Sequence, residues 1–188
     1  ESGPLPDTLI GSCDATIIAG KADSTDTLSS VAEDLLSAEG VAMSIQNGLG
    51  HAEIISKRVG AHRVVGGSTT HSAWRDGGGA VHWTGRGSIL LGRIDGSGPR
   101  QVTSDLVVAL REGGLNPKWS SDIRSEIWRK LLINVAINPV CAIAGVRNGA
   151  LVEIPELWAQ SLEAMREAEK VARASGVDLG DVDTELYL

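Results

Sequence analysis

The stretch "ATIIAGKADSTDTLSSVAEDLLSAEGVAMSIQNG", residues 15–48, decides the fold class because it holds a strand, a helix and a second strand in succession. Residues 15–21 form a short apolar run, typical of a strand buried on both faces. Residues 23–40 begin with Ser and Asp, carry apolar residues at helical spacing and end on Gly40, which predicts a helix. Residues 41–48 predict the second strand. This βαβ pattern predicts parallel strands joined by a right-handed crossover.

The rest of the first two thirds of the chain predicts further helices and strands around this unit. Residues 48–60, "GLGHAEIISKRVG", predict a glycine-rich turn that opens a second helix. Residues 62–94 hold three short β-rich runs broken by "RDGGG" and "TGRG", the pattern of an antiparallel meander. Residues 101–114 predict an amphipathic helix that ends on glycines, and "NPKWSSD" at 116–122 predicts a loop.

The last part of the sequence is wholly helical in pattern. Residues 122–144 predict one long helix, and a second is opened by Pro155 and closed by Gly176. The change from mixed to purely helical pattern predicts two domains, residues 1–121 and residues 122–188.

Composition limits the class of function. The formal net charge is −7 and the sequence pI about 5.1, which argues against nucleic-acid binding and against binding to an anionic membrane. No apolar run of transmembrane length and no signal peptide is evident. Cys13 and Cys141 stand far apart without CxxC spacing, so we expect no metal site and a reducing, cytoplasmic location.

Polar residues follow both predicted strands of the βαβ unit. Lys21 ends the first strand, and Gln46 and Asn47 end the second. The carboxyl ends of parallel strands meet at one edge of a sheet, where ligands bind, so these side chains are expected to lie together. Gly48 and Gly50 allow backbone N–H groups to approach a ligand. The alternative is a solvated lysine at a strand end beside an ordinary "NG" turn.

The stretch "IWRKLLINVAINPV", residues 127–140, combines a strongly apolar helix with polar residues at every fourth position, Lys130, Asn134 and Asn138. A helix apolar on all sides is expected to be buried, where unpaired polar groups are costly. A buried lysine loses its charge readily, which suits a proton donor or acceptor. Pro139 predicts a kink. The alternative is a lysine that extends from a helix end to solvent, with both asparagines at a helix interface.

Taken together, the motifs resemble the ketopantoate reductase (2-dehydropantoate 2-reductase) family. The segments that carry the resemblance, in chain order, are "GK", "SIQNGLG", "GGSTTHSAWRDGG", "VHWTGRG", "DIRSEIWRKLLINVAINPVCAI" and "RNGAL". The resemblance implies an α/β region followed by an all-α region. The α/β region is implied to be a cofactor domain, a partial Rossmann-like parallel sheet with an antiparallel meander. The all-α region is implied to be a helical substrate and catalytic domain.

The resemblance also gives the polar residues their roles. Lys130 is implied to protonate the ketone oxygen of ketopantoate as NADPH supplies hydride, in a reaction of pantothenate and coenzyme A biosynthesis. Asn134 and Asn138 are implied to contact the substrate hydroxyls, and Asn47 to bridge cofactor and lysine. The implied cofactor-binding residues are Lys21, Asn47 and Gly48.

The sequence departs from the family at both ends. No strand with a GxGxxG turn precedes Leu9, and the chain stops before the family's later Ser and Glu substrate contacts. Backbone contacts to the cofactor pyrophosphate are therefore expected to be missing. Because a charge-assisted hydrogen bond contributes on the order of 1.5–3 kcal/mol, NADPH affinity is expected to fall by several orders of magnitude.

Two other functions remain open from the sequence. A related β-hydroxyacid dehydrogenase that acts on another 2-oxo acid also has a lysine with an asparagine one turn later. A truncated, non-catalytic binding or oligomerising module would explain the absent GxGxxG turn. Its unpaired sheet edge predicts a homo-oligomer.

Overall fold

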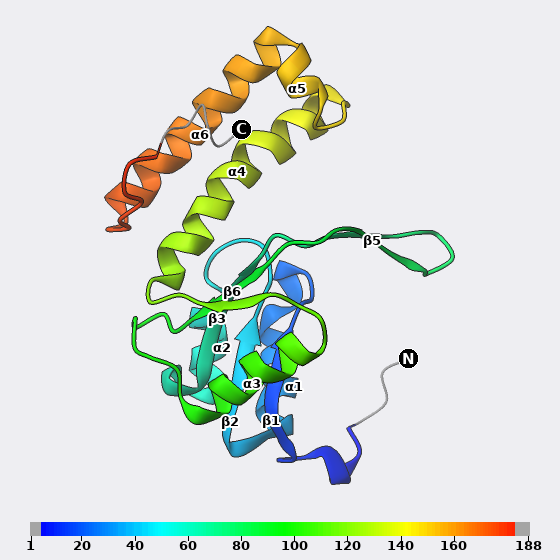
Figure 1. Cartoon of the computed structure of the whole chain (residues 1–188), viewed down its shortest axis with the longest axis vertical. Coiled ribbons are helices and arrows are strands. Elements are labelled where there is room, and N and C mark those ends of the chain that lie inside the picture. The colour runs from blue at the N-terminus through cyan, green and yellow to red at the C-terminus, as the bar shows by residue number, and fades with distance from the viewer. Residues whose placement is uncertain (1–4, 183–188) are drawn as a thin grey trace. The chain divides into compact units, whose positions relative to one another are not determined.

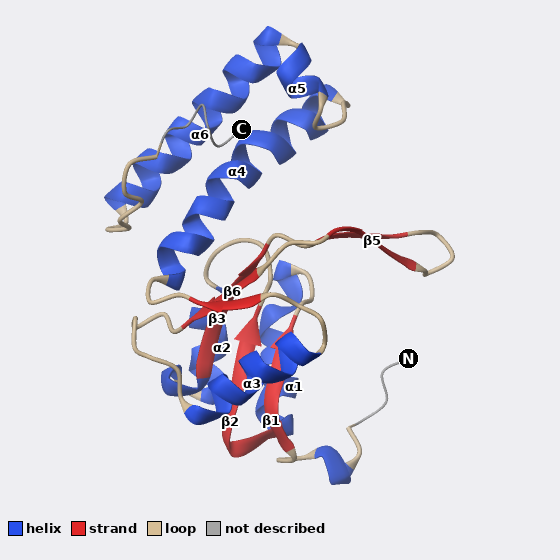
Figure 2. Ribbon diagram, viewed as in Figure 1, coloured by secondary structure: helices blue, strands red, loops and turns tan. Residues whose placement is uncertain are grey.

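The computed structural model describes residues 5–182, whose helices and strands are shown in Figures 1 and 2. The chain divides after Ile123 into two compact units, residues 1–123 and 124–188. This division lies close to the boundary proposed from the sequence at residue 121. Separate clusters of buried apolar side chains stabilise the two units.

The N-terminal unit is a sheet with helices. Its elements are η1 (Asp7–Leu9), β1 (Cys13–Ile18), η2 (Ala22–Ser24), α1 (Thr25–Leu35), β2 (Leu36–Ser44), α2 (His51–Val59), η3 (Ala61–Arg63), β3 (Val64–Thr69), β4 (Ser72–Arg75), β5 (Val81–Gly85), β6 (Ile89–Gly92), α3 (Gln101–Glu112) and β7 (Pro117–Trp119). The main sheet has the strand order β1-β2-β3-β6-β7. β1, β2 and β3 are parallel, which confirms the predicted βαβ unit, whereas β6 runs antiparallel to β3.

Helices cover both faces of the parallel strands (Figure 2). On β2, Ala42 belongs to the apolar cluster that includes Ile55 of α2, and Met43 belongs to the cluster that includes Leu106 of α3. Successive side chains of a strand point to opposite faces, so β2 must be apolar at successive positions where helices cover both faces. This explains the unbroken apolar run at 41–43.

The first helix ends earlier than predicted. α1 ends at Leu35, β2 begins at Leu36, and Gly40 lies inside β2 instead of closing the helix. A Cβ atom at Gly40 would lie 2.7 Å from the carbonyl oxygen of Cys13 in β1. Glycine is therefore needed where the two strands approach, beside an irregularity in their register at Cys13 and Ala15. The prediction was wrong because a glycine marks a helix end and a close strand contact equally well.

The segment 62–94 forms antiparallel pairs, as predicted, with four strands in place of three runs. β3 and β6 pair inside the main sheet, and β4 and β5 form a separate two-stranded ribbon between them in sequence. The backbone N–H of Thr70 donates to the Ser88 carbonyl at 3.0 Å and connects the two pairs. In Figure 1 the ribbon extends away from the sheet.

The predicted loop at 116–122 contains a short strand. β7 pairs with β6 in parallel, with Lys118 opposite Leu90. Pro117 stands at the first position of this edge strand, where its missing N–H costs no ladder bond. Three residues are too few to show a strand pattern in the sequence.

The C-terminal unit is helical in its described part. It contains α4 (Ile123–Ala144, which begins at the division), α5 (Ala150–Glu153) and α6 (Pro155–Ala174). Trp128 and Leu132 of α4 are buried in a cluster with Met165 and Ala172 of α6. Arg124 Nη2, at the start of α4, donates to the Ser175 carbonyl just after α6 at 3.0 Å, so the helices pack antiparallel.

The expectation that α4 is buried on all sides was wrong for the described residues. Only part of its surface is buried, and Ile143 is 89% exposed. α4 continues through Pro139 without interruption. By length and composition α4 is also long and apolar enough to cross a membrane, and 22% of its most apolar 18-residue stretch is buried. The sequence pattern had not indicated this. Core helices of soluble proteins meet the same test, so this observation is weak evidence for a membrane span.

Candidate active site

The carboxyl edge of β1 and β2 brings together the residues predicted there. Lys21 follows the end of β1, and Asn47 follows the end of β2; both are exposed, while Gly48 is half-buried. Gln46 links the two strand ends, because its Nε2 donates to the carbonyl oxygens of Gly20 at 3.0 Å and Lys21 at 3.2 Å. The predicted meeting of these residues at one sheet edge is therefore observed in the structure.

A buried polar network lies beneath this edge. Gln46 Nε2 donates to Thr25 Oγ1 at 2.9 Å, and Thr25 Oγ1 lies 3.0 Å from His51 Nδ1. His51 Nε2 lies 2.9 Å from the Asn47 carbonyl oxygen. Thr25, Gln46 and His51 are all buried. The network ties the loop after β2 to the start of α1 and leaves these polar groups with partners.

The loop between β2 and α2 exposes backbone to a ligand. Gly48 and Gly50 have φ of +106° and +83°, a conformation that side chains other than glycine rarely adopt. The loop leads into α2, a helix of nine residues whose first N–H groups carry partial positive charge. Together with the Lys21 ammonium at the same edge, these donors favour an anionic group.

The second group of predicted residues lies on α4. Lys130, Asn134 and Asn138 follow one another at every fourth position of the helix; the first two are half-buried and Asn138 is exposed. Two residues before each of them stands an apolar residue: Trp128, Leu132 or Ala136. Two residues correspond to a rotation of about 200° around the helix axis, so the apolar row and the polar row lie on nearly opposite sides of α4.

That apolar row is the one packed against α6. The polar row therefore lies on the side of α4 turned away from α6, where Lys130 and Asn134 are half-buried. The pKa of Lys130 is lowered from its ordinary value of 10.5 because partial burial disfavours the charged ammonium. A lowered pKa brings the ammonium closer to giving up its proton near neutral pH.

The two groups belong to different compact units: Lys21, Asn47 and Gly48 to the first, and Lys130, Asn134 and Asn138 to the second. The sequence pattern missed Thr25 and His51, which the structure adds beneath the first group. The available signal was their position, since each is the first residue of a helix that flanks a strand end. Among residues 5–182 no cluster of three or more His, Cys, Asp or Glu could hold a metal ion.

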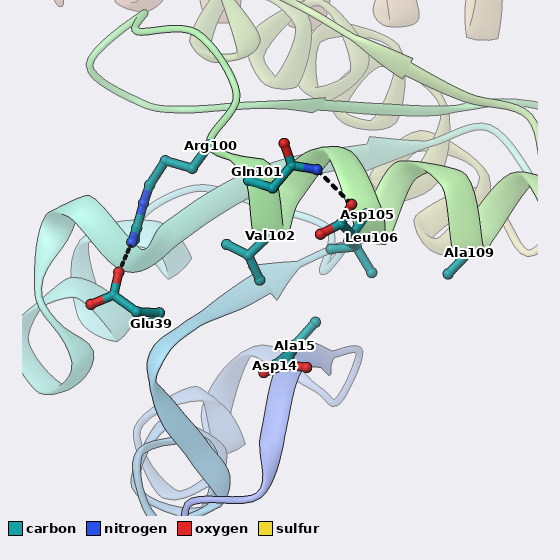
Figure 3. A pocket seen from close by; sticks show the side chains of 9 residues that line it. All are labelled: Asp14, Ala15, Glu39, Arg100, Gln101, Val102, Asp105, Leu106 and Ala109. Carbon is teal, nitrogen blue, oxygen red and sulfur yellow. Dashed lines mark hydrogen bonds and ion pairs between the residues drawn. The ribbon is translucent and has the colours of Figure 1, made fainter.

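A cavity of about 650 Å³ lies elsewhere in the N-terminal unit (Figure 3). Its lining residues are Asp14, Ala15, Glu39, Arg100, Gln101, Val102, Asp105, Leu106 and Ala109. Arg100 pairs with Glu39 across its rim, and Gln101 Nε2 donates to Asp105 at 2.8 Å. It lies at the start of β1, whereas Lys21 follows the end of that strand, so it contains none of the predicted site residues.

Known proteins share this sequence and fold. Residues 3–96 match the family model of ketopantoate reductase PanE/ApbA, and residues 122–187 match the model of its C-terminal domain. A 2-dehydropantoate 2-reductase from Archaeoglobus fulgidus is 35% identical over 88% of this chain and 54% of its own length. One from Halobacterium salinarum is 37% identical over 74% of this chain and 46% of its own length. The chain thus spans about half the length of the curated relatives it matches.

Solved structures agree with this fold. A 2-dehydropantoate 2-reductase from Geobacter metallireducens superposes with a TM-score of 0.86 over 97% of this chain and 60% of that chain, at 23% identity. A D-mandelate dehydrogenase bound to NADH and anilino(oxo)acetate superposes with a TM-score of 0.81 over 94% of this chain and 56% of that chain, at 25% identity. The Rossmann-like region followed by helices is therefore confirmed. The chain belongs to the ketopantoate reductase PanE/ApbA family.

Proposed function

We propose that this chain is part of an NADPH-dependent 2-dehydropantoate 2-reductase, which reduces ketopantoate to pantoate in coenzyme A biosynthesis. The observation that carries the proposal is the environment of Lys130 on α4. It is half-buried, its pKa is lowered by burial, and it lies on the face of α4 turned away from α6. The family matches on both sides of the division support the same reaction.

Lys130 acts as the proton donor. Its ammonium stabilises the negative charge that develops on the oxygen of the 2-oxo group during reduction. Nζ then transfers a proton to that oxygen. Partial burial strengthens this electrostatic stabilisation because fewer water molecules screen the charge. A general acid of this kind contributes about 10²- to 10⁴-fold in rate.

Asn134 and Asn138 orient the substrate. Each carboxamide offers donors and an acceptor, which suits the hydroxyl and carboxylate groups of ketopantoate. Their spacing of four residues places both along the row that contains Lys130. Asn134 is half-buried and Asn138 exposed, so we assign the tighter substrate contact to Asn134.

The residues at the carboxyl edge fit a nicotinamide dinucleotide. Lys21, Gly48 and the N-terminus of α2 offer a cation and backbone donors to its phosphates, and Asn47 lies beside them. When bound, the cofactor supplies hydride to the 2-oxo carbon. The proposal includes NADPH as the preferred form, and it places the protein in the cytoplasm, whose reducing conditions suit the free Cys13 and Cys141.

A second candidate function is the reduction of a different 2-oxo acid. The similarity to a D-mandelate dehydrogenase favours this alternative, because Lys130 and Asn134 alone do not select among 2-oxo acids. Ketopantoate carries a hydroxyl group and branched carbon, whereas the 2-oxo acid that corresponds to mandelate carries a phenyl ring. A site built to bind a hydroxyl discriminates strongly against a substrate without one.

The test is the oxidation of NADPH by the purified 188-residue chain, followed by the loss of the absorbance of the reduced nicotinamide. Ketopantoate and phenylglyoxylate are compared as substrates, and NADH as the alternative cofactor. Lys130→Ala removes the assigned proton donor. Lys170→Ala, which removes an exposed lysine on α6, is the matched control for the loss of a lysine from a helix. The expected result is turnover of ketopantoate that only Lys130→Ala abolishes.

Other outcomes separate the alternatives. Preference for phenylglyoxylate would favour the second candidate, and equal activity of the Lys130→Ala variant would contradict the assigned proton donor. A folded chain that neither turns over substrate nor binds NADPH would favour a non-catalytic module. We also propose that the chain forms a homo-oligomer, because β1 is an edge strand with Ile17 47% exposed. Sedimentation of the same samples measures this self-association.

A further inference from the structure

His51 is a buried histidine with partners on both ring nitrogens. It is 7% exposed and begins α2. Its Nδ1 lies 3.0 Å from Thr25 Oγ1, at the start of α1, and its Nε2 lies 2.9 Å from the carbonyl oxygen of Asn47. The imidazole therefore bridges the start of α1 and the loop after β2, where its partners Thr25 and Asn47 are 22 positions apart in sequence.

The chemistry of these partners fixes the direction of the hydrogen bond at Nε2. A carbonyl oxygen only accepts, so Nε2 of His51 must carry a proton and donate it to Asn47. In a neutral imidazole Nδ1 is then the acceptor, and the hydroxyl of Thr25 donates to it. The proton on Nε2 is therefore required, whereas the role of Nδ1 depends on where the Thr25 hydroxyl directs its single proton.

The same chain of hydrogen bonds continues to the other strand end. Thr25 Oγ1 accepts from Gln46 Nε2 at 2.9 Å, and Gln46 Oε1 accepts from Ser44 Oγ at 3.2 Å. Gln46 Nε2 also contacts the carbonyl oxygen of Lys21 at 3.2 Å. Ser44, Gln46, Thr25 and His51 are all buried, so a lost bond in this chain leaves a polar group without water.

We propose that His51 is a positioning residue at the carboxyl edge of the sheet: it holds the backbone of Asn47 directly and that of Lys21 through Thr25 and Gln46. The inference rests on the proposed function, because it gives Lys21 and Asn47 their value as cofactor-binding residues. His51 itself touches neither cofactor nor substrate in this scheme. Its contribution is to reduce the freedom of the loop, so that the binding groups are already in place.

A second acceptor makes the scheme testable. The Thr25 hydroxyl also lies 2.9 Å from the carbonyl oxygen of Ala22, and it has a single proton to give. If Thr25 donates to Ala22, it cannot also donate to His51 Nδ1. The contact with His51 would then need a proton on Nδ1, so the position of the imidazole proton decides between the two arrangements.

The first measurement is nitrogen-15 NMR of the imidazole of His51 in the 188-residue chain. The expected result at neutral pH is a proton on Nε2 and an Nδ1 signal shifted by its hydrogen bond to Thr25, a shift that Thr25→Ser retains and Thr25→Val loses. Ser29→Ala is the matched control, because Ser29 is fully buried on the same helix and donates to the backbone carbonyl of Thr25 at 2.6 Å, not to its side chain. An Nδ1 signal that Thr25→Val leaves unchanged would overturn the proposal, because His51 would then not act through Thr25.

The second measurement is the exchange rate of the Gln46 side-chain amide protons. Thr25→Val and His51→Leu are each expected to raise this rate about tenfold, the effect of roughly one buried hydrogen bond. Thr25→Ser and Ser29→Ala are expected to change it less than about twofold. Equal rates in Thr25→Val and Ser29→Ala would overturn the proposal, because a general loss of stability affects both variants.

The third measurement is titration of the same variants with NADPH. The expected Kd rises about tenfold in Thr25→Val and His51→Leu and is restored in Thr25→Ser. If wild type binds NADPH and Thr25→Val binds it equally well, His51 does not position the site. If wild type binds no NADPH, the proposed function fails for this chain, and the Nδ1 signal and the amide exchange still decide whether the network holds the edge.

Discussion

At the carboxyl edge of the N-terminal sheet, Lys21 and Asn47 are held by hydrogen bonds from buried side chains of α1, α2 and the loop after β2. On α4, Lys130 and Asn138 share a row because a helix repeats every 3.6 residues. The first group depends on residues distant in sequence, whereas the second depends on a local period. Tertiary contacts therefore position the first group and secondary structure positions the second. The first group should be sensitive to mutation of residues distant in sequence, and the second should not.

The largest expected effect tests what the α4 row contributes to catalysis. Lys130→Arg keeps the positive charge, but a guanidinium does not release its proton near neutral pH. We expect kcat for ketopantoate to fall about 10²- to 10⁴-fold, as for loss of a general acid. Steady-state kinetics measure it, with circular dichroism to confirm the fold. Activity close to wild type would show that charge alone suffices.

The next effect tests how α4 is anchored. Leu132→Ala removes a side chain with no exposed surface from the cluster with α6. A cavity of this kind costs about 2–5 kcal/mol in the free energy of unfolding. Ile143→Ala, at 89% exposure on the same helix, is the matched control and should change stability by less than about 0.5 kcal/mol. Similar losses from both variants in urea titrations would show that α4 is anchored differently.

A smaller effect contrasts the two groups directly. Gly48→Ala places a Cβ at a φ of +106° and 3.3 Å from His51 Nε2, which we expect to cost about 1–2 kcal/mol. Asn138→Ala removes an exposed side chain from the helix row and should change stability by less than about 0.5 kcal/mol. Thermal unfolding of both variants measures the difference. Equal costs would contradict the view that tertiary contacts hold only the first group.

The smallest effect concerns pH. Burial lowers the pKa of Lys130 from 10.5, so between the lowered pKa and 10.5 the unfolded chain binds more protons than the folded chain. The contribution of Lys130 to stability therefore rises as pH rises through this window. In Lys130→Met this contribution is absent. Urea titrations from neutral pH to pH 10 should show the stability difference shifting in favour of wild type, and a constant difference would mean that the pKa is ordinary.

The sequence by itself determined the class of fold. Apolar runs of strand length around a helix of period 3.6 gave the βαβ unit, and the loss of strand pattern after residue 121 placed the helical region. Two glycines and a polar strand end were enough to locate the edge at Lys21 and Asn47. These features are local, because each depends on residues a few positions apart.

Only the tertiary structure decided which polar groups act together and which surfaces are buried. Thr25 and His51 meet across 26 positions, and no period in the sequence records such a contact. Gly40 belongs to a strand because β1 passes 2.7 Å from where its Cβ would be. α4 is apolar on most sides, yet most of its side chains among the described residues are half-buried or exposed, and the row packed on α6 is buried. Burial depends on which neighbours are present, and that is a property of the packed fold.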